Sequence, residues 1–125
     1  MSHRVWTAIV PAVSLIALAG SAAAAPSQGE TLFKQRCGTC HAIEAGGPAK
    51  MGPPLKGVMG RKAGTAPGFA FSAALKNSGI VWDATNMDAY VAKPTGTVPG
   101  TKMMVGMPGD PAQRAAVISY LAAQK

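Results

Sequence analysis

Two cysteines and a histidine stand close together in the pentapeptide Cys37-Gly38-Thr39-Cys40-His41. This C-x-x-C-H spacing is the attachment signature of a c-type haem. Two thiols held on one turn can each bond to one of two neighbouring vinyl groups of a porphyrin. The histidine that follows then lies beneath the ring, where it can bind iron. The motif therefore predicts one covalent haem, attached through Cys37 and Cys40, with His41 as an iron ligand.

The same residue types serve other chemistries, which the rest of the sequence disfavours. A thioredoxin-like C-x-x-C requires a βαβ context, and no segment of this chain alternates convincingly enough to be a strand. A structural zinc ion requires four nitrogen or sulfur ligands, whereas Cys37, Cys40 and His41 are the only cysteines and histidine after residue 24. A disulfide between the two cysteines, beside an uninvolved histidine, is the remaining alternative.

The second iron ligand must be of another type, because His41 is the only histidine after residue 24. A methionine, a lysine or an open position remain possible. Met87 belongs to a predicted helix face and is expected in the core, whereas Met103, Met104 and Met107 stand in a Gly/Pro-rich loop from which a flexible thioether can reach iron. Spacing alone does not choose among these three. The other methionines after the first residue are Met51 and Met59.

Two protein ligands on the iron favour electron transfer over catalysis. With both axial positions filled, the iron has no room for a substrate, and a thioether ligand raises the reduction potential. We therefore expect a one-electron carrier with no catalytic residue and no enzyme activity. The alternative is a haem enzyme or a ligand-binding haem protein with a labile sixth ligand, which would lack the methionine–iron absorption band of the oxidised protein.

The first residues have the pattern of a secretory signal peptide. Arg4 supplies the positive charge, residues 5–19 are mostly apolar, and residues 21–25 are small. The apolar stretch is shorter than the roughly 20 residues that a membrane-spanning helix requires, and Pro11 interrupts it. We therefore expect a signal peptide at 1–24 and one domain at 25–125, without a membrane anchor after cleavage.

Capping patterns predict a helix at each end of this domain. Ser27 and Glu30 form the S-x-x-E capping box of a helix that runs directly into Cys37. Asp110 can cap the last helix, with Gln113 as its partner in a box-like pair. The apolar residues of that last helix recur at helical spacing on one face, namely Val117, Ile118 and Leu121.

Two shorter helices are expected in the middle of the domain. One runs from Ser72 to about residue 78, with Gly79 as its left-handed stop. The other is capped by Thr85 and ends before Pro94, and it should bury Met87, Tyr90 and Val91.

Long loops rich in glycine and proline, at 46–68 and 93–109, join the predicted helices. Such long irregular stretches are unusual in a compact domain and make sense if they wrap something other than protein. The predicted fold is therefore all-α, with three or four helices that can be read individually and the terminal helices packed together.

The chain is basic, with a formal net charge of +7. Its lysines and arginines form no run and are not interleaved with aromatic residues, so nucleic acid is a poor candidate partner. An exported basic domain instead fits docking to acidic protein surfaces, where charge mainly raises the encounter rate.

From Gly29 to its end the chain resembles the class I soluble cytochromes c of bacteria and mitochondria. That family has a small all-α fold of three to five helices around one haem c. The block Pro99-Gly100-Thr101-Lys102-Met103 presents the axial methionine in the family, so the resemblance implies Met103 as the second metal ligand. The other matching blocks are the C-x-x-C-H pentapeptide, Gly52-Pro53-Pro54-Leu55, 57–62, Ala66-Pro67-Gly68-Phe69 and Gly79-Ile80-Val81-Trp82.

The resemblance also implies roles for residues around the haem. Pro53 should accept, through its carbonyl, a hydrogen bond from the second nitrogen of the histidine, which orients that ligand. Arg61 and the indole of Trp82 should meet a haem propionate. Tyr90 should lie near the methionine sulfur and Thr101 near the propionates.

The sequence departs from the family at a few positions. Phe71 and Leu75 stand where a tyrosine and an asparagine are common, which makes the pocket less polar. The ring of basic residues around the exposed haem edge is thinner, since Arg36, Lys50 and Lys102 are present whereas Thr31 and Thr95 replace usual lysines.

The function implied by the resemblance is one-electron shuttling in the bacterial periplasm by a monomer. The donor would be a membrane quinol-oxidising complex, and the acceptor an oxidase, a reductase or a photosynthetic centre.

Overall fold

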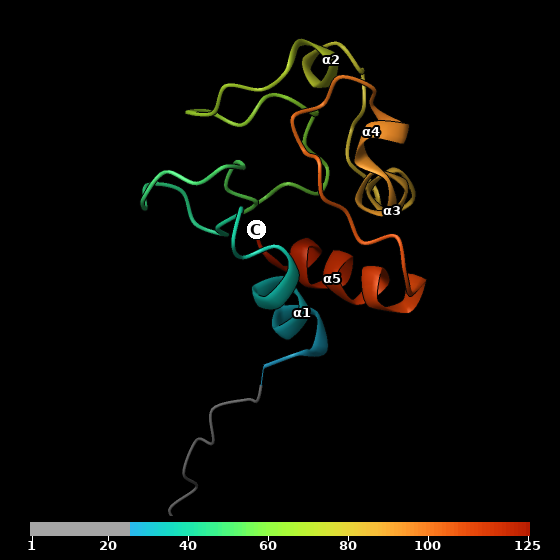
Figure 1. Ribbon diagram of the computed structural model, residues 1–125. Helices are drawn as coiled ribbons and strands as arrows, with labels where there is room; N and C mark the ends of the chain where they lie inside the picture. Colours follow the sequence, from blue (N-terminus) through green and yellow to red (C-terminus); the bar gives the residue numbers. More distant parts are fainter. Residues whose placement is uncertain (1–25) are drawn as a thin grey trace, which may run out of the picture.

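The computed structural model describes residues 26–125, so the predicted signal peptide at 1–24 lies outside the described residues. Long irregular loops join its helices (Figure 1), which are α1 (Gln28–Arg36), α2 (Ala73–Lys76), α3 (Ala84–Ala92), α4 (Pro94–Thr97) and α5 (Pro111–Ala123). The described residues hold no strand, only an isolated antiparallel bridge between Lys62 and Val81. The all-α prediction is therefore confirmed. None of the described helices is long and apolar enough to cross a membrane.

Helix α1 begins where its capping pattern predicts and carries the chain to the cysteine signature. The Ser27 hydroxyl accepts a hydrogen bond from the Glu30 backbone N–H at 3.1 Å, and the Glu30 carboxylate pairs with Lys34 one turn later. The helix ends at Cys37, whose backbone N–H donates to the Phe33 carbonyl at 2.8 Å. The pentapeptide therefore follows α1 without an intervening loop.

The structure corrects the predicted start of α3. Asp83 caps this helix in place of Thr85, because its carboxylate accepts from the Asn86 N–H at 2.8 Å and the Asn86 side chain accepts in return from the Asp83 N–H at 2.9 Å. The asparagine thus takes the place that glutamate or glutamine usually holds in a capping box. The end of α3 before Pro94 is as predicted.

Two further predictions require correction. The 93–109 segment is not all loop, because α4 occupies Pro94–Thr97. Pro94 ends α3, but its fixed φ also suits the first position of a new helix. Asp110 caps α5 by accepting from the Ala112 N–H at 2.8 Å, whereas the described hydrogen bonds include none from Gln113 back to this cap.

The terminal helices α1 and α5 lie side by side, as predicted, with α3 on the other side of α5 (Figure 1). Close approach is possible because residue 29 is a glycine: a β-carbon there would lie 2.1 Å from the Ala116 carbonyl oxygen. The Phe33 and Tyr120 rings pack beside this crossing with centroids 5.6 Å apart. Within the described chain, α2 packs against none of the other helices.

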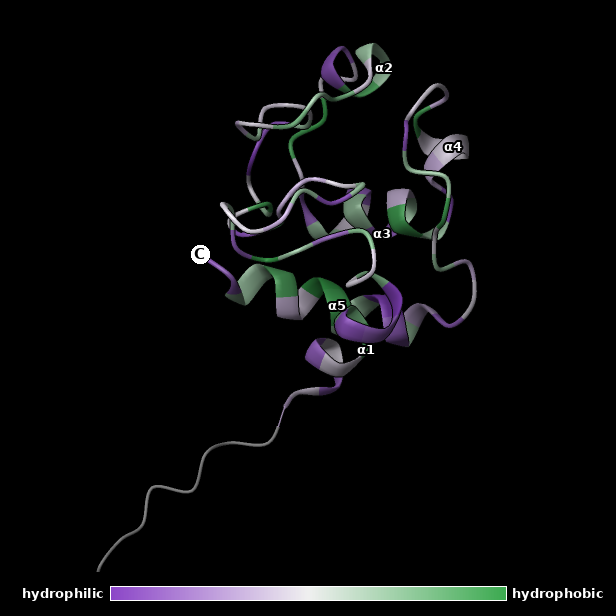
Figure 2. Cartoon of the chain, turned by 60° about the vertical axis from the view of Figure 1, so that its left-hand side comes forward, coloured by the Kyte–Doolittle hydropathy of each residue, from purple (hydrophilic) through white to green (hydrophobic). Residues whose placement is uncertain are grey.

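The core draws on the helices and the loops alike, and Figure 2 shows hydrophobic and hydrophilic residues side by side along the helices. Val117 of α5 is its most buried side chain, at 1% exposure. The buried cluster consists of Phe33, Val58, Ala63, Leu75, Trp82, Met87, Tyr90, Val91, Val98, Val117, Ile118 and Leu121. Half-buried apolar residues surround this cluster and include Leu32, Ile43, Leu55, Met59, Phe71, Met103 and Met107.

Candidate haem site

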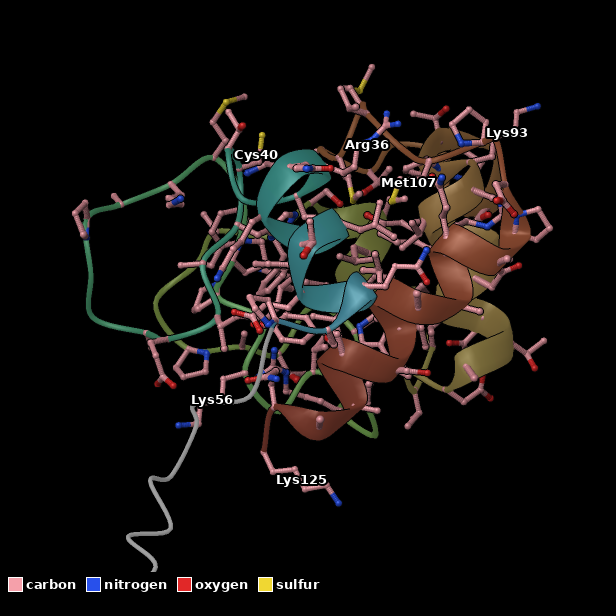
Figure 3. The ribbon with its side chains drawn as sticks, turned by 90° about the horizontal axis from the view of Figure 1, so that it is seen from below. Arg36, Cys40, Lys56, Lys93, Met107 and Lys125 are labelled. Atoms are coloured by element: carbon pink, nitrogen blue, oxygen red, sulfur yellow. The ribbon has the colours of Figure 1, made fainter. Side chains whose placement is uncertain are left out.

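The three residues of the signature are held on one turn at the end of α1. The backbone N–H groups of Cys40 and His41 both donate to the Cys37 carbonyl, at 3.0 and 2.8 Å. Both thiols are free and half-buried, and Cys40 lies at the same end of the molecule as Arg36 (Figure 3). Burial, with a smaller contribution from Cys40, raises the pKa of the Cys37 thiol. This shift disfavours a thiol–disulfide enzyme, whose attacking cysteine needs a lowered pKa.

The His41 ring is oriented by Pro53, which lies within the first long loop. Its Nδ1 lies 2.8 Å from the Pro53 carbonyl oxygen. A carbonyl only accepts, so Nδ1 carries the proton and Nε2 presents its lone pair to a metal. Burial lowers the pKa of the imidazole, against the Pro53 hydrogen bond that raises it, and the nearby Lys50 lowers it further. The lowered pKa favours the neutral ring, the form in which histidine binds metal.

Gly52 makes room for that ring. A β-carbon at this position would lie 2.4 Å from the His41 Cε1 atom and within 2.8 Å of both ring nitrogens. The backbone therefore lies directly against the imidazole, which is confined by Gly52 and by the Pro53 carbonyl together.

The segment between α4 and α5, residues 98–110, carries the three candidate methionines and is called the methionine loop below. Met103 and Met107 are half-buried against the core, whereas Met104 is 74% exposed. Burial therefore disfavours Met104 as a ligand, and the family resemblance favours Met103 over Met107. The buried Thr101 hydroxyl accepts from the Met103 N–H at 3.4 Å and lies 2.6 Å from the Tyr90 hydroxyl of α3. The start of the loop is thereby joined to α3.

Backbone pairing brings Arg61 and Trp82 together. The Trp82 N–H donates to the Arg61 carbonyl at 3.0 Å, and the Gly60 N–H donates to the Trp82 carbonyl at 2.7 Å. The buried Trp82 ring lies 5.0 Å from the Tyr90 ring, centroid to centroid. The Arg61 guanidinium donates to the Lys56 carbonyl at 3.3 Å, and burial lowers its pKa. Their expected contact with a propionate remains a prediction.

The donor set fits a haem c. Two thiols and an imidazole stand on one turn, a half-buried thioether comes from a distant loop, and Cys37 and Met103 both pack against the apolar core. A zinc site fits less well, because the residues from 26 to 125 contain no group of three or more Cys, His, Asp or Glu residues that could hold a metal ion.

Sequence reasoning gave no role to Arg114, which the structure buries to 8% exposure. One signal was available: residue 114 precedes Val117, Ile118 and Leu121 by three, four and seven positions, so it lies on the buried face of α5. Two basic residues that the resemblance placed around the haem edge hold loop carbonyls. Lys102 donates to the Ala70 carbonyl at 2.6 Å, and Lys50 donates to the Gly38 carbonyl.

Comparison with known proteins supports the same type of site, a covalent haem c. The chain matches the cytochrome c family model over residues 26–125. The cytochrome c2 of Rhodomicrobium vannielii is 42% identical over 117 residues, which cover 94% of this chain and 93% of the relative. The cytochrome c of Sesamum indicum is 41% identical over 93 residues, which cover 74% of this chain and 84% of the relative.

A solved structure is similar in both fold and sequence. The cytochrome cH from Methylobacterium extorquens superposes with a TM-score of 0.69 and 45% identity, and the match covers 76% of this chain and 94% of that one. Together with the C-x-x-C-H turn, these matches establish that this chain belongs to the cytochrome c family, as a class I c-type cytochrome that carries electrons on one covalent haem c and is not an enzyme.

Proposed function

We propose that this cytochrome is a monomeric, exported carrier that shuttles single electrons in the bacterial periplasm. It would accept an electron from a membrane quinol-oxidising complex and pass it to an oxidase, a reductase or a photosynthetic centre. The observation that carries the proposal is the confined His41 imidazole, whose Nδ1 is bound to the Pro53 carbonyl and whose Nε2 is thereby left to bind iron. Together with a methionine ligand, it would leave the iron no position for a substrate.

Each residue of the site would have a distinct role. Cys37 and Cys40 would form the two thioether bonds, and His41 and Met103 would be the axial ligands. When bound, the haem supplies an iron that changes its oxidation state by one electron. The surrounding chain would hold the two ligands in place, which would lower the rearrangement that accompanies electron transfer. Pro53, Tyr90 and Thr101 hold the ligand segments, and Arg61 and Trp82 would face the propionates.

Export rests on the leader at 1–24, which carries the charged, apolar and small-residue regions of a signal peptide. The mass of the protein purified from the periplasm tests this part. We expect the mass of residues 25–125 plus one haem. The mass of the bare 25–125 polypeptide would contradict haem attachment, and a mass that still includes residues 1–24 would contradict cleavage of the signal peptide.

The surface charge supports an acidic partner. Each acidic side chain of the described residues is already engaged: Glu30, Glu44 and Asp88 pair with Lys34, Lys56 and Arg114, and Asp83 and Asp110 cap helices. The exposed cations for which the described chain provides no hydrogen-bond partner include Arg36, Lys62, Lys76, Lys93 and Lys125. The unneutralised charge of the surface is therefore positive, which would steer the protein toward acidic docking sites.

Absorption spectra of two matched variants test the axial ligand. Met103→Ala should abolish the methionine–iron band of the oxidised protein, whereas Met104→Ala, which removes the exposed neighbour, should keep it. If the wild-type protein lacks this band, or binds cyanide and azide as fast as an open haem does, a haem enzyme or ligand-binding protein with a labile sixth position replaces the electron carrier.

A further inference from the structure

Arg114 is a cation on the buried face of α5, with only 8% of the residue exposed. Burying a charge is costly unless it is paired and fully hydrogen-bonded. An arginine retained at such a position therefore has to be satisfied by its surroundings, and its partners reveal which segments it holds together.

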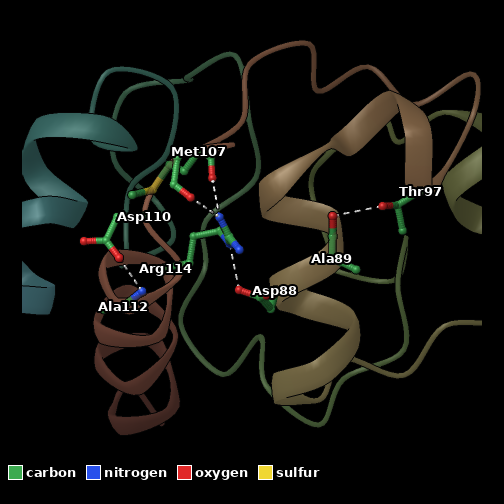
Figure 4. Close-up of polar contacts among 8 residues, drawn as sticks. Asp88, Ala89, Thr97, Met107, Asp110, Ala112 and Arg114 are labelled. Atoms are coloured by element: carbon green, nitrogen blue, oxygen red, sulfur yellow. Dashed lines mark hydrogen bonds and ion pairs between the residues drawn. The ribbon is translucent and has the colours of Figure 1, made fainter.

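The partners of Arg114 come from two other parts of the chain (Figure 4). Its Nε donates to the Asp88 carboxylate of α3 at 2.7 Å. One terminal nitrogen donates to two loop carbonyls, those of Met107 and Gly109, each at 3.0 Å. A single guanidinium thus links α5, α3 and the end of the methionine loop.

The same stretch of loop is fixed a second time. The Met107 N–H donates to the Val91 carbonyl at the end of α3, at 2.7 Å. Gly106 packs so closely against α3 that a β-carbon there would lie 2.4 Å from the Val91 carbonyl oxygen. Residues 106–109 are therefore held against α3 and α5 by both their backbone and the Arg114 side chain.

The beginning of the loop is held independently. Thr101 is joined to Tyr90 of α3, and the Lys102 ammonium donates to the Ala70 carbonyl. Met103 therefore lies in a short span between two anchors, the Thr101–Lys102 end and the 106–109 end, which the Met107–Val91 hydrogen bond and Arg114 hold jointly. Releasing one end of so short a span increases the conformational freedom of what lies between.

We propose that Arg114 is the positioning residue for the Met103 ligand: it fixes the 107–109 carbonyls so that the thioether stays at the iron. The inference rests on the proposed ligation by Met103 and adds a distant residue that controls it. Arg114 touches neither ligand and acts only through the loop backbone.

The test compares four variants of the haem-loaded protein. Arg114→Met removes all donors, and Arg114→Lys keeps the charge but loses the forked geometry. Asp88→Asn removes the ion pair while leaving the loop carbonyls bonded. Val117→Ala is the matched control, because it destabilises the same helix and its apolar side chain donates no hydrogen bond to the loop carbonyls. The readouts are the methionine–iron band, the affinity of the ferric protein for added imidazole, which competes with Met103, and the free energy of unfolding.

Arg114→Met should raise the imidazole affinity about tenfold or more, since a single hydrogen bond from a charged donor is worth roughly one such factor. Arg114→Lys should give an intermediate increase. Asp88→Asn and Val117→Ala should stay within about twofold of the wild type, even when Val117→Ala costs as much unfolding free energy.

Two results would overturn the inference. In one, Arg114→Met leaves the imidazole affinity unchanged, or raises it no more than Val117→Ala does at equal stability, so that Arg114 merely supports the fold. In the other, the wild-type protein itself lacks the methionine–iron band, so that both the proposed ligation by Met103 and this inference are wrong. Hydrogen exchange at the Met107 amide distinguishes the two cases, because it reports the loop anchor without reference to the iron.

Discussion

Single contacts around the iron ligands decide whether the site can form. Gly52 is the sharpest case, because the space that a side chain would need is filled by the His41 ring. Gly52→Ala should therefore displace the imidazole from its Pro53 partner and lower the yield of haem-loaded protein, with a stability loss of about 1–3 kcal/mol in what does load. Gly47→Ala is the control, since nothing lies within 4 Å of a β-carbon there.

Haem content and chemical unfolding measure both effects. Equal yields and midpoints for the Gly52 and Gly47 variants would show that the ring does not depend on the absence of a side chain at residue 52.

The buried hydroxyl pair of Tyr90 and Thr101 is a second case at this scale. Each single change, Tyr90→Phe or Thr101→Val, leaves the other hydroxyl without its partner and should cost about 1–3 kcal/mol of unfolding free energy. The double variant removes both groups, so its cost should be less than the sum of the two. A double-mutant cycle by denaturant titration measures this coupling, and strictly additive costs would contradict it.

The haem cofactor could be predicted from the sequence because its signal is local. The spacing of Cys37, Cys40 and His41 names its cofactor without any knowledge of the fold. Arg114 could not be assigned a partner in the same way, because its acceptors, two backbone carbonyls and a carboxylate on another helix, come together only through tertiary packing. The sequence showed that Arg114 lies on an apolar helix face, but not which groups pair with its charge.

At the scale of the helices, the α1–α5 crossing is the contact on which the others build. Gly29→Ala should separate these helices, because a β-carbon there would meet the backbone carbonyl of Ala116. We expect a loss of about 1–3 kcal/mol or more, since the obstacle is rigid backbone and cannot move aside. Gln28→Ala, an exposed neighbour on the same helix, should change stability little. Thermal and denaturant unfolding compare the two, and similar midpoints would refute the expectation.

The start of a helix could be predicted where a single residue could act as the N-cap, and it was predicted wrongly where two residues could. Ser27 caps α1 as predicted. Ser72, predicted as the first residue of a helix to about residue 78, is instead the cap of α2, which ends at Lys76. Before α3, Asp83 and Thr85 were both available, and the carboxylate with a reciprocal partner at Asn86 prevailed. Helix α4 escaped prediction because a four-residue helix rich in glycine and threonine has no apolar period to recognise.

The distribution of cations over the whole molecule predicts where partners dock. Arg36 lies at the end that carries Cys40, whereas Lys125 lies at the far end (Figure 3). Arg36→Glu should therefore slow electron transfer with an acidic partner by about 3- to 10-fold at low salt, and more than Lys125→Glu, which changes the net charge equally. Stopped-flow rates over a range of ionic strength measure this.

The slope of these rates with salt should be shallow, because Thr31 and Thr95 replace basic residues in the ring around the haem edge. A steep slope, or equal rates for the two charge reversals, would place the docking surface elsewhere.

Among residues 26–125, helix α2 packs on no other helix, and Gly64 and Gly100 of the loops lie close to it. A β-carbon on Gly100 would lie 3.1 Å from that of Ala74 in α2, and the chain just before α2 holds Lys102 through the Ala70 carbonyl. Transient local opening of this small subdomain costs less than global unfolding, and it would loosen the approach to Met103 while the α1–α5 pair stayed intact. The lifetime of a methionine–iron bond would then depend on how often the segment around α2 opens, as well as on the Arg114 end of the loop.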